Sequence, residues 1–287
     1  MLNAPPSGFE QERDSVEDIV SKLGKIAIIG GGKMGEAILS GLVNGAMFDL
    51  DSVHVAEPGE ERREFISSTY GVACYEDGSE ITHPTTVILA IKPQVLVEVC
   101  TQLAATSNFD PKRVISIAAG VTTETLQSLF TDAAIIRVMP NAPLMVGAGM
   151  SAVCIASDTP RTEGEIVCEL FALMGEAVLL DETKLNAVTA ISGSGPAYYA
   201  LFTEYLIQAG EEIGLEPDDA RLLAVQTLVG SARYLELTDA SPTDLRVAVT
   251  SPKGTTAAAL DEFRAQSLDR AVLTAVKAAV RRAEELA

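Results

Sequence analysis

The chain has 287 residues, 47% of them hydrophobic and 21% charged, which suits one large or two ordinary domains with a substantial core. Its net charge of -19 makes nucleic acid and anionic membranes unexpected partners. No apolar run reaches the ~18 residues of a membrane span. The 4 cysteines are widely spaced and only 2 histidines occur, so we expect no metal site, free thiols and a cytoplasmic protein.

The N-terminal part of the chain predicts an α/β fold. Residues 1–22 are polar, and we expect a mostly disordered tail there. Beyond it, short apolar runs alternate with helical stretches, which predicts a doubly wound parallel sheet of the Rossmann type over residues 23–181. The expected strands are 25–29, 53–56, 86–91, 113–119, 134–139, 151–156 and 177–180.

Strand patterns stop after Asp181, and residues 182–287 are expected to form an all-helical domain. The expected helices are 185–210, with an interruption near 192–196, then 217–237 and 267–287. This half is rich in alanine and apolar on more than one helix face. We therefore expect it to form a homo-oligomeric interface. The alternative is a helical domain that packs back on the sheet.

A glycine motif, G-x-G-x-x-G, joins the first expected strand to the first expected helix, as Gly30, Gly32 and Gly35. Gly30 would allow the tight turn, Gly32 a close approach of the backbone to a pyrophosphate, and Gly35 close packing of helix on strand. The helix N-terminus would add free N–H groups and a positive dipole. The motif in this context predicts a dinucleotide site, with a purely structural glycine turn as the alternative.

The residues after the second strand bear on the choice of dinucleotide. Glu57 would accept from the ribose 2′-hydroxyl of NAD and repel the 2′-phosphate of NADP. Arg62 and Arg63 follow, and either could reach a 2′-phosphate or instead pair with Glu60 and Glu61 on a solvated helix face. The sequence leaves this preference open.

Later strand ends supply further candidates, because ligands of open α/β sheets bind at the carboxyl ends of the strands. Ala90-Ile-Lys-Pro93 offers Lys92 as an anion contact, although a surface lysine is the alternative. Ala118-Ala-Gly120 offers small residues and room for a nicotinamide ring. Met139-Pro-Asn-Ala-Pro143 ends the next strand.

Four motifs, in this order, resemble the pyrroline-5-carboxylate reductase family over nearly the whole chain from about residue 25. They are Ala90–Pro93, Arg137–Asn141, Val188–Tyr198 and Val249–Leu260. The last contains Thr-Ser-Pro-Lys-Gly-Thr-Thr and is similar to the family's Thr-Ser-Pro-Gly-Gly-Thr-Thr signature. Lys253 departs from that signature, at a cost of about 1 kcal/mol if the position requires φ > 0. Glu57 is the second departure, because NADPH is the common cofactor of the family.

The resemblance implies an NAD(P)H-dependent enzyme that reduces the C=N bond of 1-pyrroline-5-carboxylate to L-proline, the last step of proline biosynthesis. NADPH is the expected cofactor, or NADH in view of Glu57. A homodimer with interlocked helical domains is implied, and a ring of dimers (a decamer) beyond it. The residues expected to hold the cofactor are Ile29, Gly30, Gly31, Gly32, Lys33, Met34, Gly35, Glu57, Arg62, Ala90, Lys92, Pro93, Ala119, Gly120 and Asn141.

The resemblance also implies a substrate loop. The residues expected there are Ser251, Gly254, Thr255 and Thr256. Gly254 would expose backbone N–H groups, and the following helix N-terminus would receive the substrate carboxylate. Thr256 and Lys92 are the expected catalytic residues, with Thr256 donating to or orienting the imine nitrogen. Taken without the family pattern, the same residues are ordinary helix-capping chemistry.

Two other functions are alternatives to the reductase. A β-hydroxyacid dehydrogenase would carry a catalytic lysine on a long central helix, and residues 185–210 contain no lysine. A dinucleotide-sensing module would bind NAD(P) and a partner protein without turnover, and would tolerate Thr256→Ala.

Overall fold

The structure is a computed structural model that describes residues 18–44 and 49–286. The chain forms two compact units. The first comprises the described residues up to Gly193 together with residues 280–286, and the second is Ser194–Ala279. The first unit therefore extends beyond the boundary expected at residue 181, because the chain after the last strand still packs against the sheet through Leu185, which is buried beside Ala152 and Cys154.

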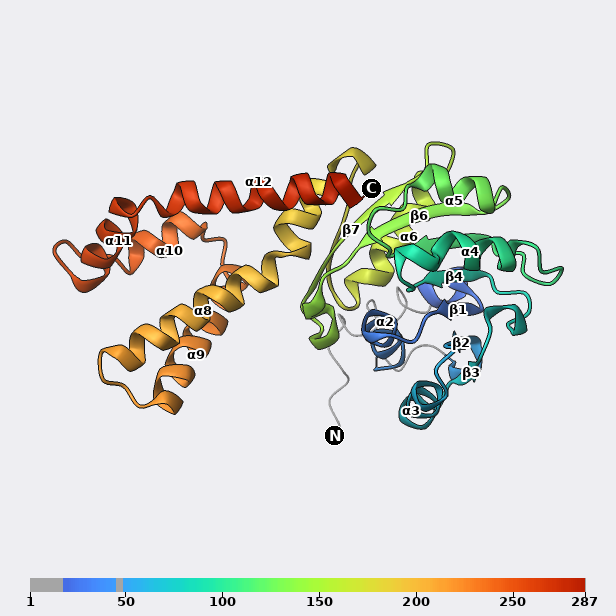
Figure 1. Cartoon of the computed structure of the whole chain (residues 1–287), viewed down its shortest axis with the longest axis horizontal. Helices are drawn as coiled ribbons and strands as arrows, with labels where there is room; N and C mark the ends of the chain where they lie inside the picture. Colours follow the sequence, from blue (N-terminus) through green and yellow to red (C-terminus); the bar gives the residue numbers. More distant parts are fainter. Residues whose placement is uncertain (1–17, 45–48, 287) are drawn as a thin grey trace, which may run out of the picture. The chain divides into compact units, whose positions relative to one another are not determined.

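The first unit contains an 8-stranded sheet (Figure 1). Its order is β3-β2-β1-β4-β5-β6-β7-β8. Neighbouring strands are parallel except β6 and β7, which are antiparallel. The two antiparallel strands are joined by only a short 3-10 turn, η3 (Ala142–Val146), which is too short for a parallel crossover. The strands are β1 (Ile26–Ile29), β2 (Val53–Ala56), β3 (Ala73–Tyr75), β4 (Thr86–Leu89), β5 (Arg113–Ser116), β6 (Ala134–Met139), β7 (Gly149–Ile155) and β8 (Gly175–Leu179).

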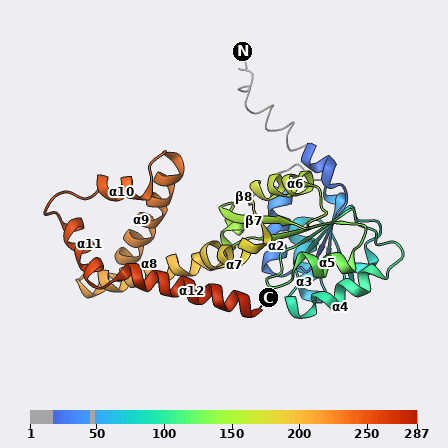
Figure 2. The same ribbon diagram turned by 90° about the horizontal axis from the view of Figure 1, so that it is seen from above.

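Helices cover both faces of this sheet because its central strands bury side chains on both sides. Ile26 and Ile28 join one core with residues of α2 and α6, and Ala27 and Ile29 join the other with residues of α4 and α5. In Figure 2, α6 and α4 lie on opposite sides of the sheet. The helices are α2 (Lys33–Asn44), α3 (Glu60–Tyr70), α4 (Pro93–Ala104), α5 (Thr123–Leu129) and α6 (Arg161–Ala172). The doubly wound fold expected from the sequence is confirmed.

The expectation of a disordered tail is wrong for residues 18–22. Residues 18–23 are helical, and Ile19 and Leu23 are buried in the core that contains α2 and α6. Arg113 also donates to the Lys22 carbonyl oxygen at 3.3 Å. Ile19 and Leu23 are four residues apart, so they lie on the same face of the helical turn and can pack together on the core. The sequence did not predict this turn because the residues around them are polar. The rest of the expected tail, residues 1–17, lies outside the described residues.

The helical half begins with a broken segment and continues as a helical unit. A 3-10 turn, η4 (Glu182–Lys184), is followed by α7 (Leu185–Val188) and a π-helical turn, η5 (Thr189–Gly193). This turn produces the interruption that the sequence predicts near residues 192–196. The helices beyond it are α8 (Gly195–Glu212), α9 (Pro217–Leu237), α10 (Pro242–Ala248), α11 (Thr255–Ala265) and α12 (Leu268–Leu286).

The second unit buries few of its large apolar side chains. Helices α8 and α9 pack together, and a Cβ at Gly210 would lie 3.1 Å from the Ala220 Cβ, so the glycine permits this close approach. Elsewhere on the pair, Tyr199 and Leu222 are each 65% exposed and Ile213 is 83% exposed. Monomers rarely leave such apolar surface uncovered. This exposure agrees with an oligomeric interface on the helical half.

Within the described ranges 18–44 and 49–286, no helix combines the length and apolarity that a membrane crossing needs. The same ranges contain no group of three or more His, Cys, Asp or Glu side chains placed to hold a metal ion.

Candidate functional site

The glycine loop lies between β1 and α2 and has the geometry that the motif predicts. Gly30 has φ 105°, and a Cβ there would lie 2.6 Å from the Ala90 carbonyl oxygen. A Cβ at Gly35 would lie 2.0 Å from the Gly30 carbonyl oxygen. Gly32 has open space around it, with nothing within 4 Å. The loop therefore turns at Gly30, packs tightly at Gly35 and leaves exposed backbone at Gly32 for a ligand.

Neighbouring strand ends hold this loop in place. Gly30 N–H donates to the Ala56 carbonyl oxygen at 2.8 Å, and Ala90 N–H donates to the Ile29 carbonyl oxygen at 2.8 Å. Helix α2 begins directly after the loop at Lys33, so its first N–H groups lie at the same edge of the sheet. Lys33 is exposed and Met34 is half-buried. A dinucleotide pyrophosphate fits this combination of exposed glycine backbone and helix N-terminus.

A cavity of about 210 Å³ opens beside the loop. It is closed on one side by the ends of β1 and β2 and on the other by α4. Most of its walls are apolar, and Glu76 and Asp77 stand at its edge. Its other lining residues are Ile29, Gly30, Ala56, Pro58, Gly78, Ile91, Val95, Val99, Gln102 and Leu103. An apolar slot at the carboxyl ends of parallel strands suits a flat aromatic ring such as adenine.

Glu57 follows β2 and is fixed by backbone amides. Its Oε2 accepts from Gly31 N–H at 2.9 Å, and its Oε1 accepts from Gly59 N–H at 3.0 Å. Gly31 is required here, since a Cβ would lie 3.1 Å from the Glu57 Cβ and 2.5 Å from the Ile66 Cδ1. The carboxylate therefore lies directly against the glycine loop.

Arg62 lies close to the loop but is already engaged. Its Nε donates to the Gly31 carbonyl oxygen at 2.6 Å, and its Nη2 pairs with a Glu36 carboxylate oxygen. Glu36 also accepts from the Tyr70 hydroxyl at 2.9 Å. The hydrogen bonds from Arg62 and Tyr70 outweigh burial and hold the pKa of Glu36 below its usual value.

The ends of β4 and β5 carry the other candidate residues. Lys92 is exposed, has extended backbone and occupies the N-cap of α4, with Pro93 in the first turn. Ala119 and Gly120 follow β5 and line a small cavity of about 50 Å³ with Arg137. The remaining lining residues are Ala118, Val138, Met139, Leu185, Asn186, Thr189 and Ala283.

An ion pair that sequence reasoning missed lies behind this small cavity. Arg137, on β6, pairs with Glu182 of η4. Glu182 also accepts from Thr123 N–H at 2.9 Å and from the Thr123 hydroxyl at 2.6 Å. Burial opposes ionisation of Glu182, but hydrogen bonds from Thr123 and Arg137 outweigh it and lower its pKa. This cluster ties the start of α5, and so the Ala119-Gly120 turn, to the end of the sheet.

Asn141, at the end of β6, has both ends of its amide engaged. Its Nδ2 donates to the Ser192 carbonyl oxygen at 3.1 Å, and its Oδ1 accepts from Met150 N–H at 2.9 Å. The side chain therefore connects the π-helical turn to β7. No direct contact of this amide with a cofactor is needed to explain its position.

The expected substrate loop lies in the second unit, before α11. Lys253 has φ 60°, the left-handed conformation that the glycine of the family signature would adopt without strain. Gly254 N–H donates to the Ser251 carbonyl oxygen at 3.0 Å, so this N–H is used inside the turn. Gly254 is the N-cap, and both Thr255 and Thr256 lie in the first turn instead of preceding the helix.

The free donors of this loop are consequently those of the helix itself. No side chain caps the start of α11, which begins at Thr255 and runs for 11 residues. Ser251 and Thr255 are exposed and Thr256 is half-buried. Hydroxyls next to the uncapped N–H groups of a helix form a good environment for a carboxylate.

Comparison with known proteins identifies both halves of the chain. Residues 182–286 match the family model described as pyrroline-5-carboxylate reductase dimerisation, and residues 25–120 match that of NADP oxidoreductase coenzyme F420-dependent. The chain is 40% identical over 263 residues to the pyrroline-5-carboxylate reductase of Synechocystis sp., covering 91% of this chain and 98% of the relative.

Solved structures agree with this relationship. A pyrroline-5-carboxylate reductase from Coxiella burnetii superimposes with a TM-score of 0.85 and 32% identity, covering 92% of this chain and 99% of that chain. The pyrroline carboxylate reductase of Plasmodium falciparum, with NADP bound, gives a TM-score of 0.80 and 27% identity, covering 92% and 98%.

Proposed function

The chain belongs to the pyrroline-5-carboxylate reductase family, and we propose that the residues described above carry out NAD(P)H-dependent reduction of the C=N bond of 1-pyrroline-5-carboxylate to L-proline. The observation that carries this assignment is that one chain holds both a glycine loop of dinucleotide-binding geometry and an uncapped helix that begins after Thr-Ser-Pro-Lys-Gly. The family excludes the β-hydroxyacid dehydrogenase alternative.

The first unit would bind the dinucleotide. Gly30 to Met34 and the N-terminus of α2 would hold the pyrophosphate, and Glu57 the adenine-side ribose. Ala90 to Pro93 would line the path of the cofactor along the strand ends, and Ala119-Gly120 would leave room for the nicotinamide. Arg62 and Asn141 would act as positioning residues, since their polar groups already contact protein atoms.

The second unit would bind the substrate. The carboxylate would accept from the first N–H groups of α11 and from the hydroxyls of Ser251 and Thr255. Thr256 would orient the imine nitrogen through its hydroxyl. Lys92 of the first unit, whose exposed ammonium group makes no hydrogen bond with the described residues, would supply a positive charge near the reacting groups.

The reaction needs orientation more than acid–base groups. When bound, the reduced nicotinamide would supply a hydride, two electrons and one proton, for the imine carbon, and the nitrogen of the substrate would take or keep one proton. Holding the two rings within about 3–3.5 Å contributes several kcal/mol to catalysis without a nucleophile. His54 is buried on β2 and His83 forms an exposed pair with Asp110. Neither histidine is among the residues predicted for the site, in agreement with a mechanism that needs no histidine.

The test is a steady-state assay of purified protein. We expect oxidation of NADH or NADPH only when pyrroline-5-carboxylate is added. Thr256→Ala should reduce kcat/KM for the substrate by roughly 10²-fold and leave nucleotide affinity nearly unchanged. Thr131→Ala, an exposed threonine of the first unit, is the matched control. Absence of turnover with both nucleotides would reject the proposed function.

The helical half is a dimerisation domain of this family, and the chain is accordingly an oligomer. We further propose a ring of dimers and a cytoplasmic location, where the free thiols would stay reduced. Light scattering during gel filtration would distinguish a dimer from a decamer.

A further inference from the structure

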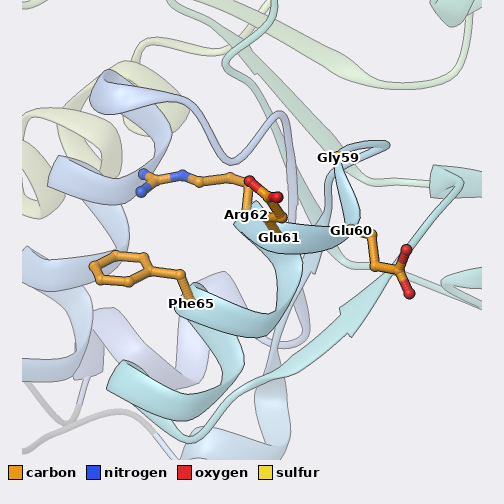
Figure 3. A pocket seen from close by; sticks show the side chains of 5 residues that line it. All are labelled: Gly59, Glu60, Glu61, Arg62 and Phe65. Atoms are coloured by element: carbon orange, nitrogen blue, oxygen red, sulfur yellow. The ribbon is translucent and has the colours of Figure 1, made fainter.

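A hollow of about 540 Å³ lies at the start of α3, beside the Glu57 carboxylate, which we proposed to hold the adenine-side ribose. Gly59, Glu60, Glu61, Arg62 and Phe65 line it, and Figure 3 shows these side chains. In a Rossmann domain this is the region that a 2′-phosphate of NADP would enter. The charges around the hollow therefore determine which dinucleotide the protein accepts.

Glu57 cannot easily leave this region. Its two carboxylate oxygens accept from Gly31 N–H and Gly59 N–H at 2.9 and 3.0 Å. Turning the side chain away would leave the N–H of the buried Gly31 without this acceptor, which is costly, whereas the exposed Gly59 N–H could bond to water. Each oxygen retains a lone pair, so the carboxylate can still accept from a ribose hydroxyl.

Arg62 is turned toward the protein. One donor reaches the Gly31 carbonyl oxygen at 2.6 Å and another pairs with Glu36. Its guanidinium carbon lies 5.1 Å from the centre of the Phe65 ring. Figure 3 shows Arg62 and Phe65 extending to the same side of α3, with Glu60 on the other side. Glu36 neutralises this cation, and leaving it would break two hydrogen bonds.

Arg63 is engaged as well. Its Nη1 donates to the carbonyl oxygens of Glu57 and Pro58 at 2.8 and 2.6 Å, and its Nη2 lies 3.7 Å from a Glu76 carboxylate oxygen. Both arginines that could have bound a 2′-phosphate therefore already bind oxygen atoms of the protein. The alternative of pairing with Glu60 and Glu61, considered from the sequence, does not occur among the described ion pairs.

The charge balance around the hollow is negative. The two guanidinium groups stand against five carboxylates, those of Glu36, Glu57, Glu60, Glu61 and Glu76. A 2′-phosphate would bring about two further negative charges. Like charges placed side by side without a compensating cation discriminate strongly against a ligand.

We propose that Glu57, held by two backbone amides and flanked by engaged arginines, makes this protein use NADH in preference to NADPH. The inference rests on the proposed function and differs from the NADPH expectation that the family resemblance implied. The Plasmodium falciparum relative with NADP bound is 27% identical, so its cofactor does not determine this preference.

The test compares both nucleotides on the whole protein, by kcat/KM with pyrroline-5-carboxylate and by direct binding measured from nucleotide fluorescence. Wild type should favour NADH at least tenfold, roughly the effect of one unfavourable charge contact. Glu57→Ser should reduce this ratio at least tenfold, mainly through tighter NADPH binding. Glu98→Gln, an exposed change of the same charge on α4, should leave the ratio unchanged.

The outcomes separate the two proposals. Preference for NADPH in the wild type, or a ratio that Glu57→Ser leaves unchanged, would overturn the inference about Glu57. Binding of NADH over NADPH without turnover would support it and reject the proposed function instead. If Glu57→Ser fails to fold, Glu57→Gln removes the charge, keeps one oxygen acceptor and carries the same expectation.

Discussion

The partly buried pair Arg137–Glu182 gives a prediction that can be worked out from the structure. We consider Glu182→Gln, which removes the charge and preserves the shape. The Arg137 side chain is 11% exposed and that of Glu182 is 30% exposed. The variant leaves a largely buried guanidinium without its counter-ion. The carbonyl oxygen of the glutamine amide can still accept one hydrogen bond from Thr123. Its NH₂ group then faces the second Thr123 donor and makes no hydrogen bond with it.

The expected cost follows from these exposures. Breaking a fully buried pair costs about 3–5 kcal/mol. Because Glu182 is nearly one-third exposed, water can partly replace it, and we expect a loss of about 2–3 kcal/mol in the free energy of unfolding. Arg137→Met removes the cation with its need for a partner, so the double variant should recover at least ~1 kcal/mol relative to the sum of the single changes.

The assay is urea unfolding followed by far-UV circular dichroism at one protein concentration, because the stability of an oligomer depends on concentration. Urea is the denaturant of choice because it is uncharged and does not screen the Arg137–Glu182 ion pair as a salt would. Additive single effects, within about 0.5 kcal/mol, would refute the reasoning, since they would mean that the two side chains do not interact.

The lowered pKa of Glu182 sets the pH range of this effect. The folded protein favours the carboxylate, so its contribution is complete above the usual value of 4.5 and is lost as pH falls through the lower pKa of the folded state. The difference in unfolding free energy between wild type and Glu182→Gln should accordingly shrink in acid. A difference that stays constant down to about pH 3 would contradict the assignment of charge.

Three further predictions test the fold. Gly35→Ala should cost about 3 kcal/mol in urea unfolding, because its Cβ would lie 2.0 Å from a backbone oxygen; a neutral effect would disprove the close packing. Lys253→Gly should add about 0.5–1 kcal/mol, since relief of the φ 60° backbone exceeds the entropy cost of glycine; a loss would contradict it. Burial, then Lys25, lowers the pKa of His54, so stability should fall as pH drops below 6.5, and His54→Gln should flatten that slope.

Thiol reactivity gives a fourth, separate check of the core. Burial raises the pKa of both Cys100 and Cys154 to about 12, so neither should react with a thiol reagent at pH 8 until urea unfolds the protein. Mass spectrometry of labelled peptides would identify the reactive cysteines. Rapid labelling of Cys100 in the native protein would show that the core beneath α4 opens.

Local patterns predicted the elements that depend on local chemistry. The apolar runs that became β1, β4 and β5 are buried on both faces, which makes them continuous in sequence and easy to recognise. The glycine spacing predicted the loop because two of its requirements are local: Gly30 turns with φ 105°, and Gly35 lies against the Gly30 carbonyl oxygen. The edge strand β3 was missed, since its three residues are only partly buried and carry little apolar pattern.

The sequence did not predict interactions between residues that are far apart in the chain. The Glu182 carboxylate meets Thr123 across 59 positions of the chain, and Arg62 meets Glu36 across 26. Nothing in the local composition selects these partners from 40 acidic and 21 basic residues. The packing of Ile19 and Leu23 on the core was not predicted for the same reason, since their partners lie in α2 and α6.

The sequence by itself therefore determined the doubly wound sheet, the helical half, the dinucleotide loop and the family, because these depend on periodicity, glycine sterics and short motifs. Tertiary structure alone decided which donors remain free. It engaged Arg62 and Arg63 with the protein, used the Gly254 N–H inside its own turn and left the first turn of α11 uncapped. Hydrogen bonds and ion pairs between distant residues depend on which surfaces the fold brings together, and that is a property of the packed chain.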